Sequence, residues 1–293
     1  MVSIIIPARN EKFLQKTIDC LIEKATGDYE IIAGLDGYWP TPAIKDHPKV
    51  TLLHAAESIG MRPMINSMAR IASGEYILKI DAHCQIGEGF DEILAADCED
   101  DWIVVPRQYS LDDEAWDINH GKPTIDYWYL SPPTYIENIE EAASRDRGLH
   151  GTRWHERKSF PGCHDKKIDD LMSFQGSFWF MTKKHFNRIG VMEPASYGNF
   201  AYEAVELGMK TWLCGGRVVV NKNTWYAHLH KGEKHGRGYM LQKSSVRKAA
   251  EYCVDTWMNN KWSGTVPGRN IKWLVEYFAP VPGWDNFDWE RSW

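Results

Sequence analysis

The stretch "YILKIDAHCQIG", residues 76–87, decides how the rest of the chain is interpreted. It begins with an apolar run that is typical of a buried strand, and the run stops at Asp81. Ala82, His83 and Cys84 follow at once, which places a carboxylate, an imidazole and a thiol together at one strand end. Three interpretations compete: a site for a metal ion and a diphosphate, a redox or zinc site, and a polar strand end without a ligand.

Predicted strands and helices alternate around this stretch. Strands are expected at residues 2–7, 29–37, 50–55, 75–80 and 101–106, and helices at 11–26 and 61–73. The strands mostly lack an alternation of apolar and polar residues, so they suit a sheet that is covered on both faces. The pattern predicts an α/β fold with a mostly parallel central sheet and helices on both faces.

Residues 106–172 interrupt this order with many charges, aromatic clusters and a Pro-Pro pair. We interpret them as an insertion, either on the acceptor side of a site or as a surface excursion that binds nothing. The order then returns, with strands at 177–181 and 216–222, a short helix capped by Thr182, and helices at 200–208 and 240–259. We expect one domain over 1–239, followed by a helix and a Trp-rich tail, 240–293, that pack on it.

Composition excludes some classes of function. A net charge of -6 gives no overall electrostatic case for nucleic acid. Met1 leads directly into an apolar strand, and no apolar run is long enough to span a bilayer. The six cysteines form no CxxC pair, which is typical of reduced thiols and predicts a cytoplasmic protein. Cys84 has no second cysteine nearby, which disfavours zinc.

Polar groups gather at the carboxyl ends of the predicted strands, where open α/β sheets bind ligands. Residues 7–9, Asp36 and the pair Asp81 and His83 all occupy such ends. A carboxylate and an imidazole suit a divalent ion of borderline character such as Mn²⁺, with positions left for water and substrate oxygens. The alternative is that Asp81 caps the next turn and His83 is a bystander.

Two distant segments could complete such a site. The stretch "NTWYAHLHKGEKHGRGY", residues 223–239, mixes three histidines with three glycines, two lysines and one arginine. It could supply a third ligand and close over phosphates, or it could be a solvated basic loop. Glu203 and Glu206 share one face of a predicted helix, where a carboxylate could serve as a general base. Two charges on a surface helix are the alternative.

Taken as a set, these motifs resemble the GT-A-type glycosyltransferases, in particular the family-2 enzymes and the polypeptide N-acetylgalactosaminyltransferases. "IIIPARNE" is similar to their first strand and nucleotide-contacting loop, and Asp81-Ala82-His83 to the Asp-x-His metal motif of the second group. Three further stretches are similar to later parts of the fold: "FQGSFWFMTKKHFNRIG", "YEAVELGMKTWLCGGRVVV" and "AHLHK". The resemblance covers about residues 2–105 and 173–239.

The resemblance implies a nucleotide-sugar donor, first of all a UDP-sugar, held by Mn²⁺ or Mg²⁺ through its diphosphate. It assigns the metal to Asp81, His83 and His228. Donor contacts would come from Pro7, Arg9, Glu11, Asp36, Arg62 and Gly176, with Lys231 and Arg237 of the basic run on the phosphates. Glu203 would be the catalytic group. Inverting family-2 enzymes usually carry Glu-Asp where this chain has Glu203-Ala204, so the stereochemistry stays open.

The expected activity is therefore transfer of a hexose or an N-acetylhexosamine to a hydroxyl acceptor. The acceptor stays open among a glycan, a lipid-linked glycan, a protein and a modified nucleobase. Two other functions remain: a nucleotidyltransferase that makes the sugar nucleotide, and a sugar- or nucleotide-binding module without turnover. "PARNEKF" lacks the glycine-rich loop that nucleotidyltransferases of similar fold place after their first strand, which disfavours the former.

Overall fold

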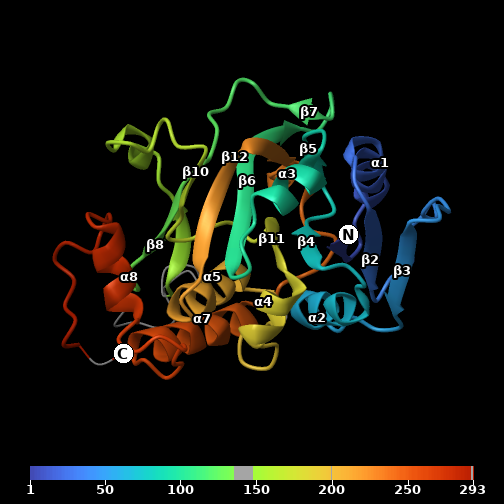
Figure 1. The fold of residues 1–293 in the computed structure, drawn as a ribbon. Coiled ribbons are helices and arrows are strands. Elements are labelled where there is room, and N and C mark those ends of the chain that lie inside the picture. The colour runs from blue at the N-terminus through green and yellow to red at the C-terminus, as the bar shows by residue number, and fades with distance from the viewer. Residues whose placement is uncertain (135–147, 199, 292) are drawn as a thin grey trace.

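A computed structural model of the chain describes residues 1–134, 148–198, 200–291 and 293 (Figure 1). Its centre is a mixed sheet with the strand order β10-β12-β6-β11-β4-β1-β2-β3. Neighbouring strands pair in parallel except at β11, which is antiparallel to β4 and β6, and at β10, which is antiparallel to β12. The bounds are β1 (Val2–Ala8), β2 (Tyr29–Asp36), β3 (Val50–Ala55), β4 (Tyr76–Ile80), β6 (Trp102–Asp112), β10 (Ile168–Asp170), β11 (Phe178–Thr182) and β12 (Arg217–His228).

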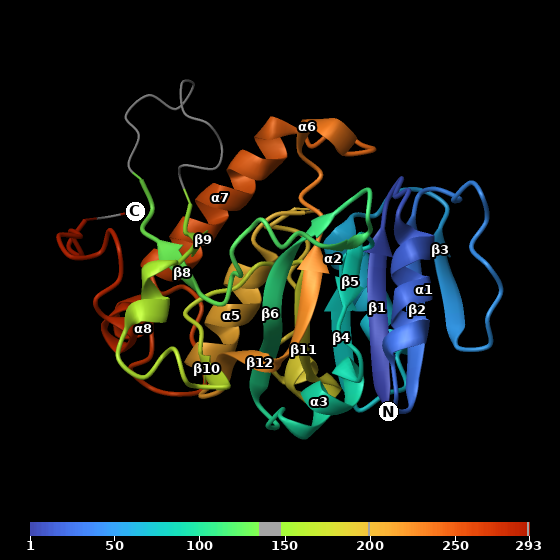
Figure 2. The ribbon, with the colours of Figure 1, turned by 90° about the horizontal axis from the view of Figure 1, so that it is seen from above.

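Helices cover both faces of this sheet, as Figure 2 shows. On one face α1 packs on the short strand β5 and α3 on β12, and on the other α2 packs on β1 and β2, α4 on β11, and α5 on β6 and β12. The bounds are α1 (Leu14–Lys24), α2 (Met61–Ile71), α3 (Phe90–Ala96), α4 (Lys183–Arg188), α5 (Glu203–Leu213) and β5 (Cys84–Ile86). The predicted α/β class with a mostly parallel, doubly covered sheet is confirmed.

Double coverage explains why the central strands are apolar on both sides. In β1, Ile4, Ile5 and Ile6 have no exposed surface, although successive side chains point to opposite faces. α1 presents Leu14, Ile18 and Leu21 to the sheet, at helical spacing. Each of these side chains contributes about 1.5–3 kcal/mol of burial free energy, so the strands stay fixed while their carboxyl ends face solvent.

The structure corrects several predicted bounds. Strand β6 does not end at Pro106 but continues to Asp112, because β12 shifts its register between Asn221 and Trp225 and follows it. A proline is tolerated at such an irregularity. The predicted strand 216–222 likewise runs on to His228, and the predicted helix 200–208 runs from Glu203 to Leu213. The sequence interpretation missed β5 and α3 altogether.

The predicted insertion contains ordered elements around residues 135–147, which lie outside the described part. It supplies β7 (Asp117–Ile118), which pairs with β6, the hairpin β8 (Trp128–Ser131) and β9 (His150–Arg153), a 3-10 helix (Glu156–Ser159) and the edge strand β10. Beyond residue 230 the chain forms α6 (Gly232–His235), α7 (Lys243–Met258) and α8 (Ile271–Phe278). Trp257, Leu274 and Phe278 join the main core. We keep the division at 239 and the insertion 106–172 as proposals.

Candidate active site

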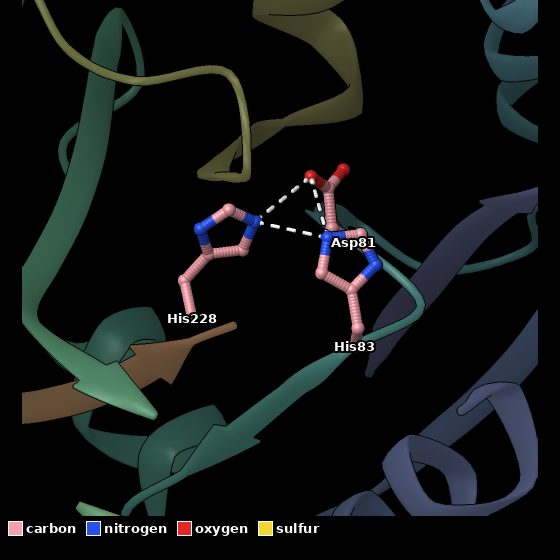
Figure 3. Close-up of side chains that lie close together, drawn as sticks. All are labelled: Asp81, His83 and His228. Atoms are coloured by element: carbon pink, nitrogen blue, oxygen red, sulfur yellow. Dashed lines mark hydrogen bonds and ion pairs between the residues drawn. The ribbon is translucent and has the colours of Figure 1, made fainter. Parts of the chain in front are cut away.

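Three side chains converge at the carboxyl edge of the sheet (Figure 3). Asp81 directly follows β4, His83 directly precedes β5, and His228 is the last residue of β12. β5 pairs antiparallel with the end of β12, with Cys84 opposite His228. This short pairing carries His83 to the side of His228, 145 residues away along the chain.

The atoms that face one another are all possible metal ligands. Nε2 of His228 lies 3.1 Å from Nε2 of His83 and 3.4 Å from Oδ2 of Asp81. Nε2 of His83 lies 3.9 Å from the same oxygen, and all three ligand atoms fall within 4.8 Å of one another. Two imidazole nitrogens and one carboxylate oxygen suit Mn²⁺ or a similar divalent ion. The donor set therefore fits the ion that the sequence resemblance implies.

Glu11 supports this cluster from the loop after β1. Its Oε2 lies 3.1 Å from Nδ1 of His83 and accepts a hydrogen bond of 2.8 Å from Nζ of Lys231. Burial by itself would raise the pKa of Glu11, but His83 and Lys231 outweigh it and lower that pKa. Since an ionised carboxylate only accepts hydrogen bonds, Nδ1 of His83 is the nitrogen that donates to Glu11, and Nε2 is the nitrogen that faces His228 and Asp81.

A buried lysine lies beneath the cluster. Lys79 has no exposed surface; its Nζ donates to Oδ1 of Asp81 at 2.7 Å, to Oε2 of Glu203 at 3.3 Å and to the carbonyl of Gly176. Burial alone would lower the pKa of Lys79, but the two carboxylates raise it. Burial alone would raise the pKa of Asp81, but Lys79 and the histidines hold it well below its usual range. Asp81 is therefore ionised and ready to bind a cation.

Glu203 is also buried and lies beside Lys79. Its Oε1 accepts a 2.6 Å hydrogen bond from Nε1 of Trp179, and its Oε2 faces Lys79. Burial is the main cause that raises the pKa of Glu203 above its usual value. A Cβ at Gly176 would lie 2.8 Å from Oε2 of Glu203, so the glycine permits this close approach. The alternative of a surface helix with two charges is wrong, because every residue of α5 is buried.

A pocket opens above the cluster and contains five of the predicted donor contacts. Its lining consists of Pro7, Ala8, Arg9, Glu11, Asp36, Gly60, Met61, Met64, Asp81, Ala82, His83, Phe200, Lys231, Tyr239 and Leu241. Pro7, Arg9, Glu11, Asp36 and Lys231 were expected there. The carboxylate of Asp36 is already engaged, because it accepts hydrogen bonds from Ser58 and from the N–H groups of Ile59 and Gly60 at the start of α2.

Three predicted donor residues lie outside this lining: Gly176, which contacts Glu203, and the two arginines Arg62 and Arg237. Arg62 has no exposed surface, and its guanidinium donates to Glu206 and to the carbonyls of Glu193 and Ala201. Any influence of Arg62 on a nucleotide must therefore pass through its neighbours. Arg237 places its guanidinium 4.5 Å from the ring centroid of Phe200, which is a lining residue.

The basic run contains a short helix where the sequence suggested only a flexible loop. This segment, 231–239, includes α6. His235 and Lys234 pair with Asp113 at 2.6 and 2.7 Å, which ties the segment to the turn after β6. The guanidinium carbon of Arg9 lies over the ring of Tyr239, 4.7 Å from the ring centroid. The segment is thus held across one side of the pocket by charge and ring contacts.

Sequence reasoning missed several residues of this region, above all Lys79, Trp179, Phe200 and Tyr239. Lys79 carried a usable signal, since a charge within an apolar central strand is costly unless it is paired. The redox and zinc interpretation of Cys84 finds no support, because that thiol is buried, outside the cluster, and burial raises its pKa. Among the described residues no helix combines the length and apolar character needed to cross a bilayer. The cytoplasmic location stays a prediction.

Comparison with known proteins supplies the family. The chain is 24% identical over 269 residues to polypeptide N-acetylgalactosaminyltransferase 5 of Caenorhabditis elegans, covering 80% of this chain and 40% of that protein. It is 24% identical over 281 residues to the putative polypeptide N-acetylgalactosaminyltransferase 13 of Drosophila melanogaster, covering 88% and 46%. The chain thus spans less than half the length of these relatives.

Solved structures share the fold. GalNAc-T7 with UDP, GalNAc and Mn²⁺ aligns with a TM-score of 0.69 at 16% identity, over 89% of this chain and 49% of that one. TarS residues 1–349 of S. aureus in complex with UDP-GlcNAc aligns at 0.51 and 12% identity, over 87% and 72%. These likenesses confirm the GT-A fold. Residues 3–190, more than half of the chain, match the description "Glycosyl transferase family 2", and the chain therefore belongs to glycosyl transferase family 2.

Proposed function

We propose that the chain is a metal-dependent glycosyltransferase that moves a sugar from a UDP-sugar to a hydroxyl acceptor. The observation that carries the proposal is the convergence of Asp81, His83 and His228 at the edge of a pocket that also contains Arg9 and Lys231. Two basic side chains beside a site for a divalent cation suit a diphosphate, whose non-bridging oxygens share negative charge on both phosphate groups.

In this proposal Asp81, His83 and His228 hold Mn²⁺ or Mg²⁺. When bound, such an ion supplies Lewis-acid stabilisation of the charge that develops on the departing diphosphate. Lys231 and Arg9 add fixed positive charge from the pocket wall, and Arg237 adds more from its position over the ring of Phe200. Lys231 already lies 2.8 Å from Glu11, so a diphosphate would compete with that carboxylate for the ammonium group.

The remaining predicted residues have positional roles in the proposal. Pro7 and Asp36 would line the nucleoside side, with Asp36 acting through the N-terminus of α2 that it holds in place. Gly176 and Glu203 would lie beneath the transferred sugar. Both oxygens of Glu203 are already engaged by Lys79 and Trp179, so we propose that it orients the site and does not remove the acceptor proton. Arg62 would keep α2 and α5 in register below the pocket.

The donor sugar is best sought among hexoses and N-acetylhexosamines, because the relatives are named as N-acetylgalactosaminyltransferases. The acceptor stays open among a glycan, a lipid-linked glycan, a protein and a modified nucleobase. The hairpin of β8 and β9 is where its contacts are to be sought, since Nε2 of His230, beside the cluster, lies 3.2 Å from a guanidinium nitrogen of Arg153 on β9.

The test is a panel of UDP-sugars, each incubated with the full chain and Mn²⁺ or with EDTA. A glycosyltransferase releases UDP slowly by donor hydrolysis, and only in the presence of the ion. A binding module would raise the unfolding temperature with one UDP-sugar but release no UDP. A nucleotidyltransferase would instead form pyrophosphate from UTP and a sugar phosphate. The proposal is overturned if no UDP-sugar raises the unfolding temperature of the chain and none is hydrolysed to UDP.

A further inference from the structure

We infer that Glu11 is a positioning residue that fixes the metal-binding tautomer of His83 and links the metal cluster to segment 231–239. The inference rests on the proposed function, because it takes the cluster to bind a divalent ion. It concerns a residue that the sequence pointed to only as part of the nucleotide pocket.

Three segments of the chain hold the Glu11 carboxylate in one place. Its Oε1 accepts the N–H of Phe13 at 3.2 Å, at the entry to α1. Its Oε2 meets Nδ1 of His83 at 3.1 Å and Nζ of Lys231 at 2.8 Å. Glu11 is 8% exposed, so these contacts, and not water, satisfy most of its hydrogen-bonding capacity.

The two histidines of the cluster differ in this support. Nδ1 of His83 is paired with a carboxylate, whereas the buried Nδ1 of His228 has no partner among the described residues. A carboxylate on the far nitrogen of a metal-binding histidine fixes its tautomer and ring orientation and makes it a stronger ligand. His83 is therefore the preorganised nitrogen ligand, and its preorganisation depends on Glu11.

The same carboxylate oxygen also holds Lys231, three residues after His228. Segment 231–239 is fastened to the β1–α1 loop at two further points, where Nδ2 of Asn10 donates to the carbonyl of Gly238 at 2.7 Å and Lys12 lies 2.8 Å from Nδ1 of His235. Both the observed position of segment 231–239 and the orientation of His83 therefore use Glu11. By linkage, an ion that favours the oriented His83 also favours these contacts of the segment, and the reverse holds.

The experiment measures Mn²⁺ binding to the full chain by electron paramagnetic resonance, without any donor. Glu11→Leu removes both the charge and the acceptor, and we expect its Kd for Mn²⁺ to rise about 10- to 100-fold. Glu11→Gln keeps an acceptor oxygen, and we expect a smaller rise. In ¹⁵N spectra of the metal-free chain, Nδ1 of His83 should be the protonated nitrogen in the wild type and lose that preference in Glu11→Leu.

A matched control is Glu30→Leu. Glu30 also bridges separate segments, accepting hydrogen bonds from Ser3 at 2.6 Å and from the N–H of Ser73 at 2.7 Å, but it lies on β2 away from the pocket lining. Glu30→Leu should lower the unfolding temperature of the chain and leave its Kd for Mn²⁺ unchanged.

Hydrogen exchange tests the link to segment 231–239. We expect Mn²⁺ to slow amide exchange there in the wild type and to have little effect in Glu11→Leu. An unchanged Kd and His83 tautomer in a folded Glu11→Leu variant would overturn the inference; if that variant does not fold, an unchanged Kd and tautomer in Glu11→Gln does so. Wild-type protein that binds no Mn²⁺ would overturn the metal site of the proposed function first, and this inference with it.

Discussion

The molecule contains two clusters of charged side chains, and they differ in how many of their polar atoms have partners within the protein. In the first, Asp81, His83 and His228 turn their ligand atoms toward one another beside a pocket. In the second, Glu206 is fully buried between Arg62 and Lys210, whose Nζ donates at 2.6 Å, and it also accepts the N–H of Glu193 at 2.9 Å. We call them the pocket cluster and the buried cluster.

The comparison separates charges whose partners all belong to the protein from charges for which we propose a metal ion as partner. The buried cluster pairs every oxygen of its carboxylate with donors from the protein. The pocket cluster places two imidazole nitrogens 3.1 Å apart, a distance at which only one of them can donate to the other. We therefore expect substitutions in the pocket cluster to affect catalysis and metal binding, and those in the buried cluster to affect stability.

The largest effect is expected for Asp81→Ala. Loss of the only carboxylate of the pocket cluster should weaken Mn²⁺ binding and reduce metal-dependent transfer or donor hydrolysis about 10³-fold, because metal stabilisation of a leaving diphosphate amounts to several kcal/mol. Initial rates with saturating UDP-sugar measure this. Glu30→Leu is the control, because Glu30 lies on β2 and is not part of the pocket lining or of the cluster. Full activity in Asp81→Ala would remove the metal assignment.

The second substitution, Arg62→Met, tests the buried cluster. It leaves Glu206 with one cationic partner and strips two backbone carbonyls of their donor, so we expect a loss of about 3–5 kcal/mol of unfolding free energy. Urea denaturation measures it. The Kd for Mn²⁺ of the folded fraction should stay as in the wild type. A stable variant that had lost Mn²⁺ binding would contradict the separation of the two clusters.

Lys79→Met should show both kinds of effect, because Lys79 joins Asp81 to Glu203. Without the ammonium group Glu203 remains buried beside Asp81, and its pKa, already raised in the wild type, should rise further. A folded-state pKa above the unfolded value gives stability that is present at low pH and lost as pH rises through the folded pKa. As the pH is lowered from 7 to 5, the unfolding temperature of Lys79→Met should therefore rise relative to that of the wild type. Thermal unfolding followed by circular dichroism measures this difference. A constant difference over this range would exclude the mechanism.

The smallest effect is expected for Thr182→Ala, which sets the scale for a local change away from both clusters. The Thr182 side chain accepts the N–H of His185 and caps α4. Its loss should cost about 1 kcal/mol of unfolding free energy. Chemical denaturation measures the cost, and neither activity nor the Kd for Mn²⁺ should change. A loss as large as that of Arg62→Met would show that this region tolerates no local change, and stability would then not distinguish the clusters.

Much of the fold could be predicted because local pattern and global burial agree. Continuous apolar runs such as Ile4–Ile6 can only be buried on both faces, and the cap at Thr182 is a local signal that the structure confirms. The extension of β6 past Pro106 could not be predicted, because it depends on a register shift in β12, more than 100 residues later. Strand β5 was missed because its three residues are too few to show a period.

In the candidate site, too, the local sequence pattern predicts some features and long-range contacts decide the others. The position of Asp81 and His83 at a strand end follows from the sequence, since the carboxyl ends of parallel strands form one edge of a sheet. The contact of Glu11 with His83 joins residues 72 positions apart through side-chain rotamers, which no sequence period records. Arg62 makes contacts that the sequence did not indicate: its guanidinium donates hydrogen bonds to Glu206 and to the carbonyls of Glu193 and Ala201, and its role at the nucleotide stays a prediction.

The most direct test of the central claim is crystallography of the full chain grown with MnCl₂ and UDP, with data collected at the manganese absorption edge. We predict one anomalous peak between Oδ2 of Asp81 and the Nε2 atoms of His83 and His228, with the diphosphate of UDP beside it and Lys231 turned toward the phosphates. Bound UDP with no anomalous peak at this cluster, or a peak held by other residues, would contradict the account.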